Sequence, residues 1–282
     1  MANVSRAVLI TGCSTGIGRA TAQRLARSGH TVYATARRPE SPADLEAHGC
    51  RTLALDVLDE DSMRAAVEAV VEEQGAVGAL VNNAGYSQSG AIETLPMESV
   101  RRQFETNVFG LIRMCQLVLP AMREQGWGRI VNISSMGANF TFPGGGVYHA
   151  TKYAVEAISD ALRFEVAGFG IDVTVLQPGL ISTEFGATAA ASVTEEQDGP
   201  YAQFNAAVAN ATTQAYERGP LRRLGGDGDD VARAVEAAID ADRAPIRRRI
   251  TPSAHLLVTQ RRLTPTRLWD RMMASQFPQP GR

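Results

Sequence analysis

The chain has 282 residues, which is enough for one α/β domain whose core buries a central sheet. Hydrophobic residues make up 44% and charged residues 21%, and the net charge of −2 argues against a nucleic acid as the main partner. The three cysteines, Cys13, Cys50 and Cys115, are widely spaced and form no C-x-x-C pair. This usage is typical of a reducing cytoplasm and predicts no metal site.

The N-terminal residues run almost at once into a short apolar strand and a glycine loop, which leaves no room for a signal peptide. No apolar run approaches the ~20 residues that a membrane span needs. We therefore expect a cytoplasmic protein without a membrane span.

Short apolar runs rich in β-branched residues alternate with longer stretches of helical period, which is the pattern of a parallel sheet covered on both faces. This alternation predicts a single domain over 1–282, a Rossmann-type doubly wound α/β sheet of about seven strands, with ligands at the carboxyl ends of the strands. The expected strands are 7–11, 31–35, 52–55, 79–82, 129–134, 172–177 and 249–251. The expected helices are 18–28, 59–74, 97–124, 148–167 and 229–242.

Two regions depart from this alternation of strands and helices. Residues 185–226 are rich in Ala, Thr, Gln and Gly and directly follow a strand end, where we expect a substrate lid. Residues 246–282 mix Arg with Leu, Trp and Met, which predicts an amphipathic pair of helices. The sequence leaves open whether this extension covers the pocket, another subunit or a membrane surface.

A glycine-rich segment, Thr11-Gly12-Cys13-Ser14-Thr15-Gly16-Ile17-Gly18, joins the first strand to a helix and predicts a dinucleotide site. Gly12 permits the tight turn, Gly16 lets the backbone approach a pyrophosphate, and Gly18 allows close packing of helix on strand. The free N–H groups of the helix N-terminus then face the phosphates. The expected cofactor contacts here are Gly12, Ser14, Thr15, Gly16, Ile17 and Gly18.

The end of the second strand indicates which nicotinamide cofactor binds. Ala36 stands where a carboxylate would bind the ribose of NAD, and Arg37 follows with a guanidinium suited to a 2′-phosphate. The alternative is a solvated pair of surface arginines, Arg37 and Arg38. We favour the phosphate site and therefore predict NADP(H) over NAD(H).

The third strand ends in Asp56 and Val57. The Asp56 carboxylate is placed to accept a hydrogen bond from the adenine amino group. Its alternative role is the N-cap of the helix expected over 59–74.

Tyr148 and Lys152 stand four residues apart and therefore share one face of a helix. A phenol with a pKa of about 10 is a poor base at neutral pH, but a neighbouring ammonium and an oxidised nicotinamide ring both favour its ionised form. Ser135, at the end of the fifth strand, is placed to polarise a substrate oxygen, and Ser134 is the competing candidate, facing the core or the cofactor. His149 points away from Tyr148 by about 100° and is expected at the surface or in packing.

Lys152 is also the only lysine among the 28 lysines and arginines of the chain. An arginine bias of this kind carries no functional message. The exception places a flexible ammonium with a movable proton where a proton relay needs one.

Together these motifs resemble the short-chain dehydrogenase/reductase family over nearly the whole chain, and within it the 17β-hydroxysteroid and retinol dehydrogenase-like group. The softer similarity to that group lies in the residues around 11–14, 33–37 and 263–268. The family similarity lies in Thr11 to Gly18, the Asn82-Asn83-Ala84-Gly85 turn, Asn107, Ser135, Tyr148 with Lys152, and Pro178-Gly179 with Thr183.

The resemblance implies a role for each matching residue. Tyr148 is the general acid/base, Lys152 lowers its pKa and binds the nicotinamide ribose, Ser135 orients the substrate, and Asn107 holds a water in a proton relay. It also implies a homodimer or homotetramer built on the helices 97–124 and 148–167. The remaining cofactor contacts that it implies are Asn83, Ala84 and Gly85 on the adenosine side, and Pro178, Gly179, Ile181 and Thr183 at the nicotinamide end.

The sequence thus predicts an NADP(H)-dependent oxidoreductase that interconverts a carbonyl and a secondary alcohol on a hydrophobic small molecule, which is steroid-, retinoid- or polyketide-like. The alternative is an NADPH-binding regulator without turnover, which the complete tetrad disfavours. A sugar-nucleotide epimerase is disfavoured by the glycine spacing and the short C-terminal region.

Overall fold

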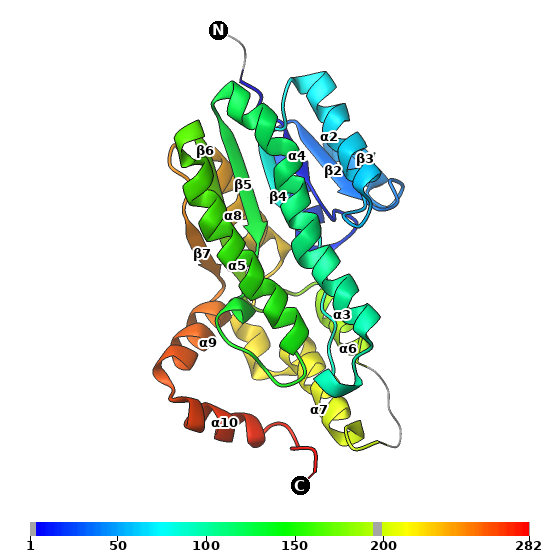
Figure 1. The fold of residues 1–282 in the computed structure, drawn as a ribbon, viewed down its shortest axis with the longest axis vertical. Helices are drawn as coiled ribbons and strands as arrows, with labels where there is room; N and C mark the ends of the chain where they lie inside the picture. Colours follow the sequence, from blue (N-terminus) through cyan, green and yellow to red (C-terminus); the bar gives the residue numbers. More distant parts are fainter. Residues whose placement is uncertain (1–3, 194–198, 282) are drawn as a thin grey trace.

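A computed structural model describes residues 4–193 and 199–281. Within these ranges seven strands, all paired in parallel, form one sheet in the order β3-β2-β1-β4-β5-β6-β7 (Figure 1). The strand order reverses between β1 and β4, and such a switch point is where doubly wound sheets bind ligands. The strands are β1 (Val8–Ile10), β2 (Val32–Ala36), β3 (Arg51–Ala54), β4 (Ala79–Asn82), β5 (Gly128–Ile133), β6 (Ile171–Pro178) and β7 (Arg247–Ile250). The predicted Rossmann-type sheet is confirmed.

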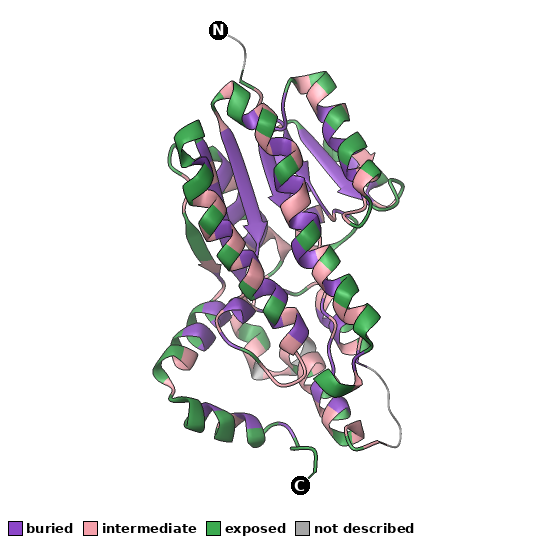
Figure 2. Cartoon of the chain, viewed as in Figure 1, coloured by how far each residue is buried: buried purple, intermediate pink, exposed green. Residues whose placement is uncertain are grey.

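Alternation along each strand divides the core between the two faces of the sheet. In β1, Val8 and Ile10 join one buried cluster, whereas Leu9 joins the other. Helices α1 (Gly16–Arg27) and α8 (Gly228–Asp240) cover the first face. Helices α2 (Glu60–Gln74), α4 (Gly110–Gln125) and α5 (Gly146–Val166) cover the second, and Figure 2 shows the buried sheet behind them.

The helix expected over 97–124 is interrupted. It consists of α3 (Met97–Phe104), a π-helical turn (Glu105–Phe109) and α4. Its apolar period continues through the interruption, so the sequence predicts one long helix there. A π turn inserts extra backbone into the helix, as is frequent at functional sites, and here it contains Asn107.

The predicted lid region, directly after β6, is largely helical. It contains α6 (Phe185–Ala191), α7 (Ala202–Thr213), a π-helical turn (Gln214–Arg218) and a 3-10 helix (Pro220–Leu224). Further 3-10 helices elsewhere in the chain span Ala43–His48, Ile92–Thr94, Met136–Ala138 and Ala167–Phe169.

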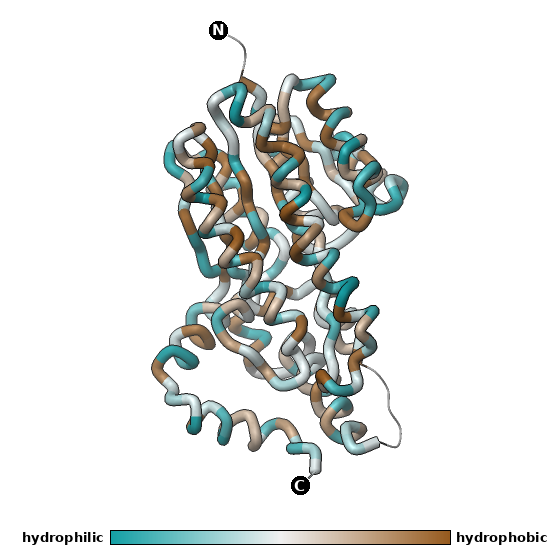
Figure 3. The backbone as a smooth tube through the Cα atoms, in the orientation of Figure 1, coloured by the Kyte–Doolittle hydropathy of each residue, from teal (hydrophilic) through white to brown (hydrophobic). Residues whose placement is uncertain are grey.

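The C-terminal extension forms the predicted pair of helices, α9 (Pro252–Leu263) and α10 (Thr266–Ala274), whose apolar and polar positions alternate along the tube in Figure 3. The Trp269 ring of α10 lies 6.0 Å from the ring of Phe140 and 6.0 Å from that of Phe142. The extension thus packs against the loop that leads into α5. Among the described residues no helix is both long enough and apolar enough to cross a bilayer.

Candidate active site

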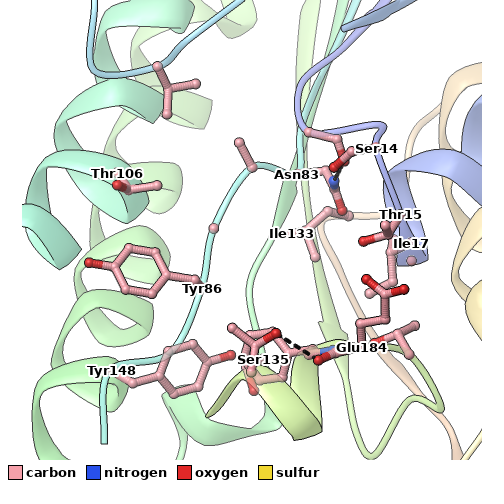
Figure 4. Close-up of a pocket in the computed structure, with 18 of the residues that line it drawn as sticks. Ser14, Thr15, Ile17, Asn83, Tyr86, Thr106, Ile133, Ser135, Tyr148 and Glu184 are labelled. Atoms are coloured by element: carbon pink, nitrogen blue, oxygen red, sulfur yellow. Dashed lines mark hydrogen bonds between the residues drawn. The ribbon is translucent and has the colours of Figure 1, made fainter. Parts of the chain in front are cut away.

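The carboxyl ends of the central strands open into one cleft of about 580 Å³. Its wall includes Ser135, Tyr148, Lys152 and all the predicted cofactor contacts except Gly18, and several of these side chains are seen in Figure 4. Neither Gly18 nor Asn107 lines the cleft. The structure therefore brings predicted residues from seven separate segments of the sequence to one place.

The glycine loop between β1 and α1 depends on close backbone contacts. Gly12 and Gly16 have positive φ angles of 74° and 61°, which favour glycine. The Asn83 side chain donates hydrogen bonds of 2.9 Å to the carbonyls of both Thr11 and Gly12. A Cβ at Gly18 would lie 2.4 Å from the Gly12 carbonyl oxygen and from Asn83 Nδ2, so Gly18 is a packing position behind the loop.

Arg37 and Asp56 line the far end of the cleft. The Asp56 carboxylate accepts a hydrogen bond of 3.0 Å from the Leu58 N–H, whereas Asp59 caps α2 by accepting from Asp61 and Ser62. The alternative that Asp56 caps this helix is wrong, because the chain makes one more turn, closed by Asp59 N–H to the Asp56 carbonyl at 3.1 Å, before the helix begins.

Tyr148, Ser135 and Lys152 meet at the other end of the cleft. Figure 4 shows the Tyr148 ring directed toward Ser135, which follows β5. Lys152 Nζ lies 5.8 Å from the centre of the Tyr148 ring and donates a hydrogen bond of 2.9 Å to the Ile133 carbonyl. The helical spacing and the end of β5 together place a phenol, a hydroxyl and an ammonium beside one another.

Burial controls the protonation of this pair. It raises the pKa of Tyr148 to about 12, with the Ser135 hydroxyl acting in the opposite direction. It also lowers the pKa of Lys152 to about 8, with the Glu156 carboxylate acting in the opposite direction. In the chain alone burial outweighs the hydrogen bond with Ser135, so Tyr148 holds its proton at neutral pH and is suited to act as an acid.

The buried Asn107 side chain ties the loop after β4 to α5. Its Oδ1 accepts from the Tyr86 N–H at 3.1 Å, and its Nδ2 donates to the Tyr86 carbonyl and to Thr151 Oγ1, both at 3.0 Å. Both amide hydrogens of Asn107 are therefore used within the protein. Its contact with Thr151 fixes the turn of α5 that carries Lys152.

Ser134 and His149, which adjoin Ser135 and Tyr148 in the sequence, are both buried. Ser134 is buried and lies on the wall of the cleft, and its Oγ has no hydrogen-bond partner within the described chain. His149 is buried, not at the surface, and its Nδ1 lies 2.7 Å from the Gly137 carbonyl oxygen. It packs under the short turn that follows Ser135.

Several side chains of the cleft were not predicted from the sequence. Phe185 lies with its ring 5.6 Å from Tyr148 and 6.1 Å from Tyr216, so the lid region supplies an aromatic wall beside the phenol. Phe185 and Tyr216 belong to no sequence motif. The one indication of a role in the site is that both lie within the predicted lid, 185–226. The others are Leu55, Leu58, Tyr86, Gln88, Ser99, Arg102, Thr106, Ile133, Glu184 and Thr188. No cluster of three potential metal ligands occurs in residues 4–193 and 199–281.

The model of the short chain dehydrogenase family matches residues 6–194. The chain belongs to this family. Over 276 residues, covering 95% of each chain, it is 31% identical to an NADPH-dependent 3-dehydrocapnine reductase from Ornithobacterium rhinotracheale.

Other relatives agree on the family. A 3-ketodihydrosphingosine reductase from Bacteroides thetaiotaomicron is 45% identical over 178 residues, and that match spans 63% of this chain and 65% of the relative. A crystal structure of a short-chain dehydrogenase from Streptomyces avermitilis superposes with a TM-score of 0.77 and 33% identity, covering 97% of this chain and 95% of the other. The resemblance to the family is confirmed, and the 17β-hydroxysteroid and retinol dehydrogenase-like group stays a prediction.

Gly85 packs closely against Asn107 and lies near Lys152. A Cβ at this position would lie 3.1 Å from Asn107 Oδ1 and 3.8 Å from Lys152 Nζ. We expect Gly85→Ala to lower kcat at least tenfold while the protein still folds, because the added methyl group displaces the Asn107 amide, which fixes the turn of α5 that carries Lys152. Steady-state kinetics with a thermal melt checks this. Gly168→Ala is the control, because Gly168 is exposed, has no positive φ, as at Gly85, and a Cβ there would meet nothing within 4 Å; wild-type kcat in Gly85→Ala contradicts the expectation.

Proposed function

We propose that the protein is an NADP(H)-dependent oxidoreductase that interconverts a carbonyl and a secondary alcohol on a hydrophobic small molecule. The observation that carries this proposal is the meeting of Tyr148, Ser135 and Lys152 on the wall of the cleft that begins at the glycine loop. A nicotinamide cofactor, when bound, supplies or accepts the hydride. The chain supplies the proton.

The glycine loop fits a dinucleotide. At Gly16 a Cβ would point to the Thr183 side chain, 3.4 Å from its Cβ, so glycine keeps the space between the loop and Thr183 open. The N-cap residue of α1, Thr15, makes no side-chain capping bond, which leaves the first N–H groups of the helix to a phosphate. Pro178, Gly179 and Ile181 line the cleft on the side of Thr183 and would hold the nicotinamide end.

Arg37 favours the phosphorylated cofactor. It lines the cleft directly after the buried Ala36, where a carboxylate would repel a 2′-phosphate. A guanidinium can hold a phosphate through two parallel hydrogen bonds. The name of the NADPH-dependent relative supports the same choice.

In reduction, Tyr148 donates its proton to the carbonyl oxygen as the alkoxide forms, and Ser135 donates a second hydrogen bond that holds this oxygen in place. The ammonium of Lys152 stabilises the phenolate left behind and binds the nicotinamide ribose. Asn107 keeps the helix turn of Lys152 in register through its hydrogen bond to Thr151. In oxidation, the same phenolate removes the proton from the alcohol.

The substrate we propose is a hydrophobic ketone, reduced in the cell. Phe185 and Tyr216 place aromatic surface next to Tyr148, which suits an apolar group on the carbonyl carbon. Two relatives are a 3-ketodihydrosphingosine reductase and a 3-dehydrocapnine reductase, which supports reduction. The same names argue against an NADPH sensor without turnover. We propose that the lid over this substrate, predicted over 185–226, is formed by the described residues 185–193 and 199–226 of a single-domain enzyme; residues 194–198 of the predicted range lie outside the described residues.

A spectrophotometric screen tests the proposal with steroid, retinoid, polyketide-like and sphingosine-like ketones, each with NADPH and NADH. In Tyr148→Phe we expect turnover of any active ketone to fall about a thousandfold while NADPH binding is nearly unchanged, because the variant loses only the transferable proton. Tyr153→Phe, an exposed tyrosine of the same helix, is the matched control and should keep its activity. Retained turnover in Tyr148→Phe refutes the assigned acid.

The cofactor preference has a separate test. We expect Arg37→Ala to raise the KM for NADPH by about ten- to a hundredfold and to leave the KM for NADH nearly unchanged, because a charge-assisted hydrogen bond is worth roughly 1.5–3 kcal/mol. Arg27→Ala, at the exposed end of α1, controls for the loss of one positive charge. Equal effects on the two cofactors count against the phosphate site.

A further inference from the structure

The C-terminal part of the chain carries a charge opposite to that of the rest. Residues 248–281 contain six arginines and a single carboxylate, Asp270, which gives this segment a net charge of +5. The other residues together have a net charge of −7, so the overall value of −2 does not reveal the basic segment. The six arginines are Arg248, Arg249, Arg261, Arg262, Arg267 and Arg271.

The protein does not neutralise these arginines. Elsewhere in the fold arginines pair with carboxylates, as Arg24 does with Asp229 at 2.9 Å and with Glu236 at 2.6 Å. Within residues 4–193 and 199–281, none of the six forms an ion pair with a carboxylate. Arg261 donates to the Thr264 carbonyl at 3.1 Å, which leaves its charge uncompensated. The positive charge of the segment is therefore available to a partner.

The helical period brings arginine and leucine together on the outer side of α10. Trp269 and Met273, four residues apart, are buried and mark the inner side of this helix. Arg267, Leu268 and Arg271 lie on the opposite side and are exposed. Figure 2 shows exposed residues along α10. The outer side thus presents two guanidinium groups with an apolar side chain between them.

The exposed side of α9 has the same mixture. Leu256 and Leu263, seven residues apart and so on one face, are 48% and 79% exposed, and Arg262 beside them is exposed as well. The Arg261 guanidinium lies 5.4 Å from the centre of the Trp269 ring and joins α9 to α10. We call the exposed side chains of the two helices the arginine–leucine surface: Leu256, Arg262, Leu263, Arg267, Leu268 and Arg271.

This combination suits a partner that offers both negative charge and an apolar interior. An anionic bilayer offers both, because its headgroup phosphates attract guanidinium groups and its acyl boundary accepts leucine side chains. A nucleic acid offers the charge, but the arginine–leucine surface contains no aromatic ring on which a base could stack, since Trp269 faces inward and is buried. A second copy that met this surface with its own would bring like charges together.

We propose that the arginine–leucine surface is a docking site for a bilayer that contains anionic lipid. Trp269 holds the extension against Phe140 and Phe142, at 6.0 Å from each ring. Both phenylalanines belong to the loop that joins Ser135 to Tyr148, so docking brings this side of the candidate site close to the bilayer. The proposal goes beyond the proposed function, and docking itself involves no turnover.

Vesicle co-sedimentation with the full chain tests the proposal. Vesicles of phosphatidylcholine mixed with phosphatidylglycerol are compared with vesicles of phosphatidylcholine alone, at about 0.1 M and about 0.5 M salt, because salt screens surface charge. We expect the protein to sediment with the mixed vesicles at the lower salt, and to remain in solution at the higher salt or with phosphatidylcholine alone.

Substitutions on α10 identify the surface. Arg267→Gln/Arg271→Gln should weaken binding to the mixed vesicles about 25-fold, because each arginine near an anionic surface contributes roughly fivefold. Arg267→Lys/Arg271→Lys keeps the charge and should bind like the wild type. Arg27→Gln/Arg123→Gln removes two exposed arginines at the ends of α1 and α4 and should also bind like the wild type.

A variant on α9 keeps the test independent of the folding of the α10 variants. Leu263→Ser changes a highly exposed side chain without a change in charge and should weaken binding about threefold, because serine does not enter the acyl boundary. Circular dichroism and a thermal melt check that each variant is folded. Equal binding to both kinds of vesicle, unchanged binding in the charge-free α10 variant, or an equal loss in Arg27→Gln/Arg123→Gln overturns the proposal.

Two measurements without lipid identify the other occupants. In sedimentation velocity, self-association that Arg267→Gln/Arg271→Gln abolishes would assign the surface to a second copy and overturn the proposal. In fluorescence anisotropy, tighter binding to a labelled DNA duplex than to the mixed vesicles at the same salt would assign it to a nucleic acid. If the wild type docks on vesicles but reduces no ketone, the proposed function fails while the docking surface stands; ketone reduction without docking gives the reverse result.

Discussion

The burial of one ammonium group is the constraint on which the rest of the candidate site depends. Lys152 reaches the last carbonyl of β5, which fixes α5 against the end of the sheet and sets the distance from Nζ to the Tyr148 ring. A methyl group added at Gly85 would press on Asn107, whose Oδ1 would lie 3.1 Å away, and would come into van der Waals contact with this ammonium. Placing a charge there is unfavourable in itself, so the hydrogen bond from Nζ to the Ile133 carbonyl is needed to offset part of the cost.

The fold provides this arrangement through the parallel sheet. Because parallel strands end at the same edge, the turns after β1, β4, β5 and β6 converge on one cleft. Asn83 joins two of these turns by donating to the carbonyls of Thr11 and Gly12. The π turn in the helix beyond then presents Asn107 to the loop after β4 and to α5 at once. These hydrogen bonds thus fix the loops and the turn of α5 that carries Lys152 relative to the sheet.

Local features of this protein were predictable from the sequence. The alternation of apolar runs and helical segments predicted the sheet, and the strand expected at 79–82 has the observed bounds. The glycine loop and the four-residue spacing of Tyr148 and Lys152 were predictable because each is a property of consecutive residues within one turn or one helix. These features are set by the backbone and need no knowledge of distant contacts.

Features that arise from tertiary contacts were not predictable. The π turn lies inside a continuous apolar period, so the segment was expected to be one helix. His149 was expected at the surface or in packing, and its burial depends on a loop that folds over it. Tyr216 and Arg102 line the cleft from segments with no motif. The pairing of Glu156 with Arg247 joins residues 91 positions apart, and no short pattern records it.

The central claim is that hydride passes between a nicotinamide and a carbonyl carbon while Tyr148 supplies the proton. Isotope transfer tests it most directly: a ketone found in the screen is reduced with each diastereomer of [4-²H]NADPH, and the alcohol is analysed by mass spectrometry and NMR. The account predicts one deuterium on the carbinol carbon from one diastereomer alone, and none at that carbon from D₂O. Deuterium on the carbinol carbon from D₂O, or from both diastereomers equally, would contradict it.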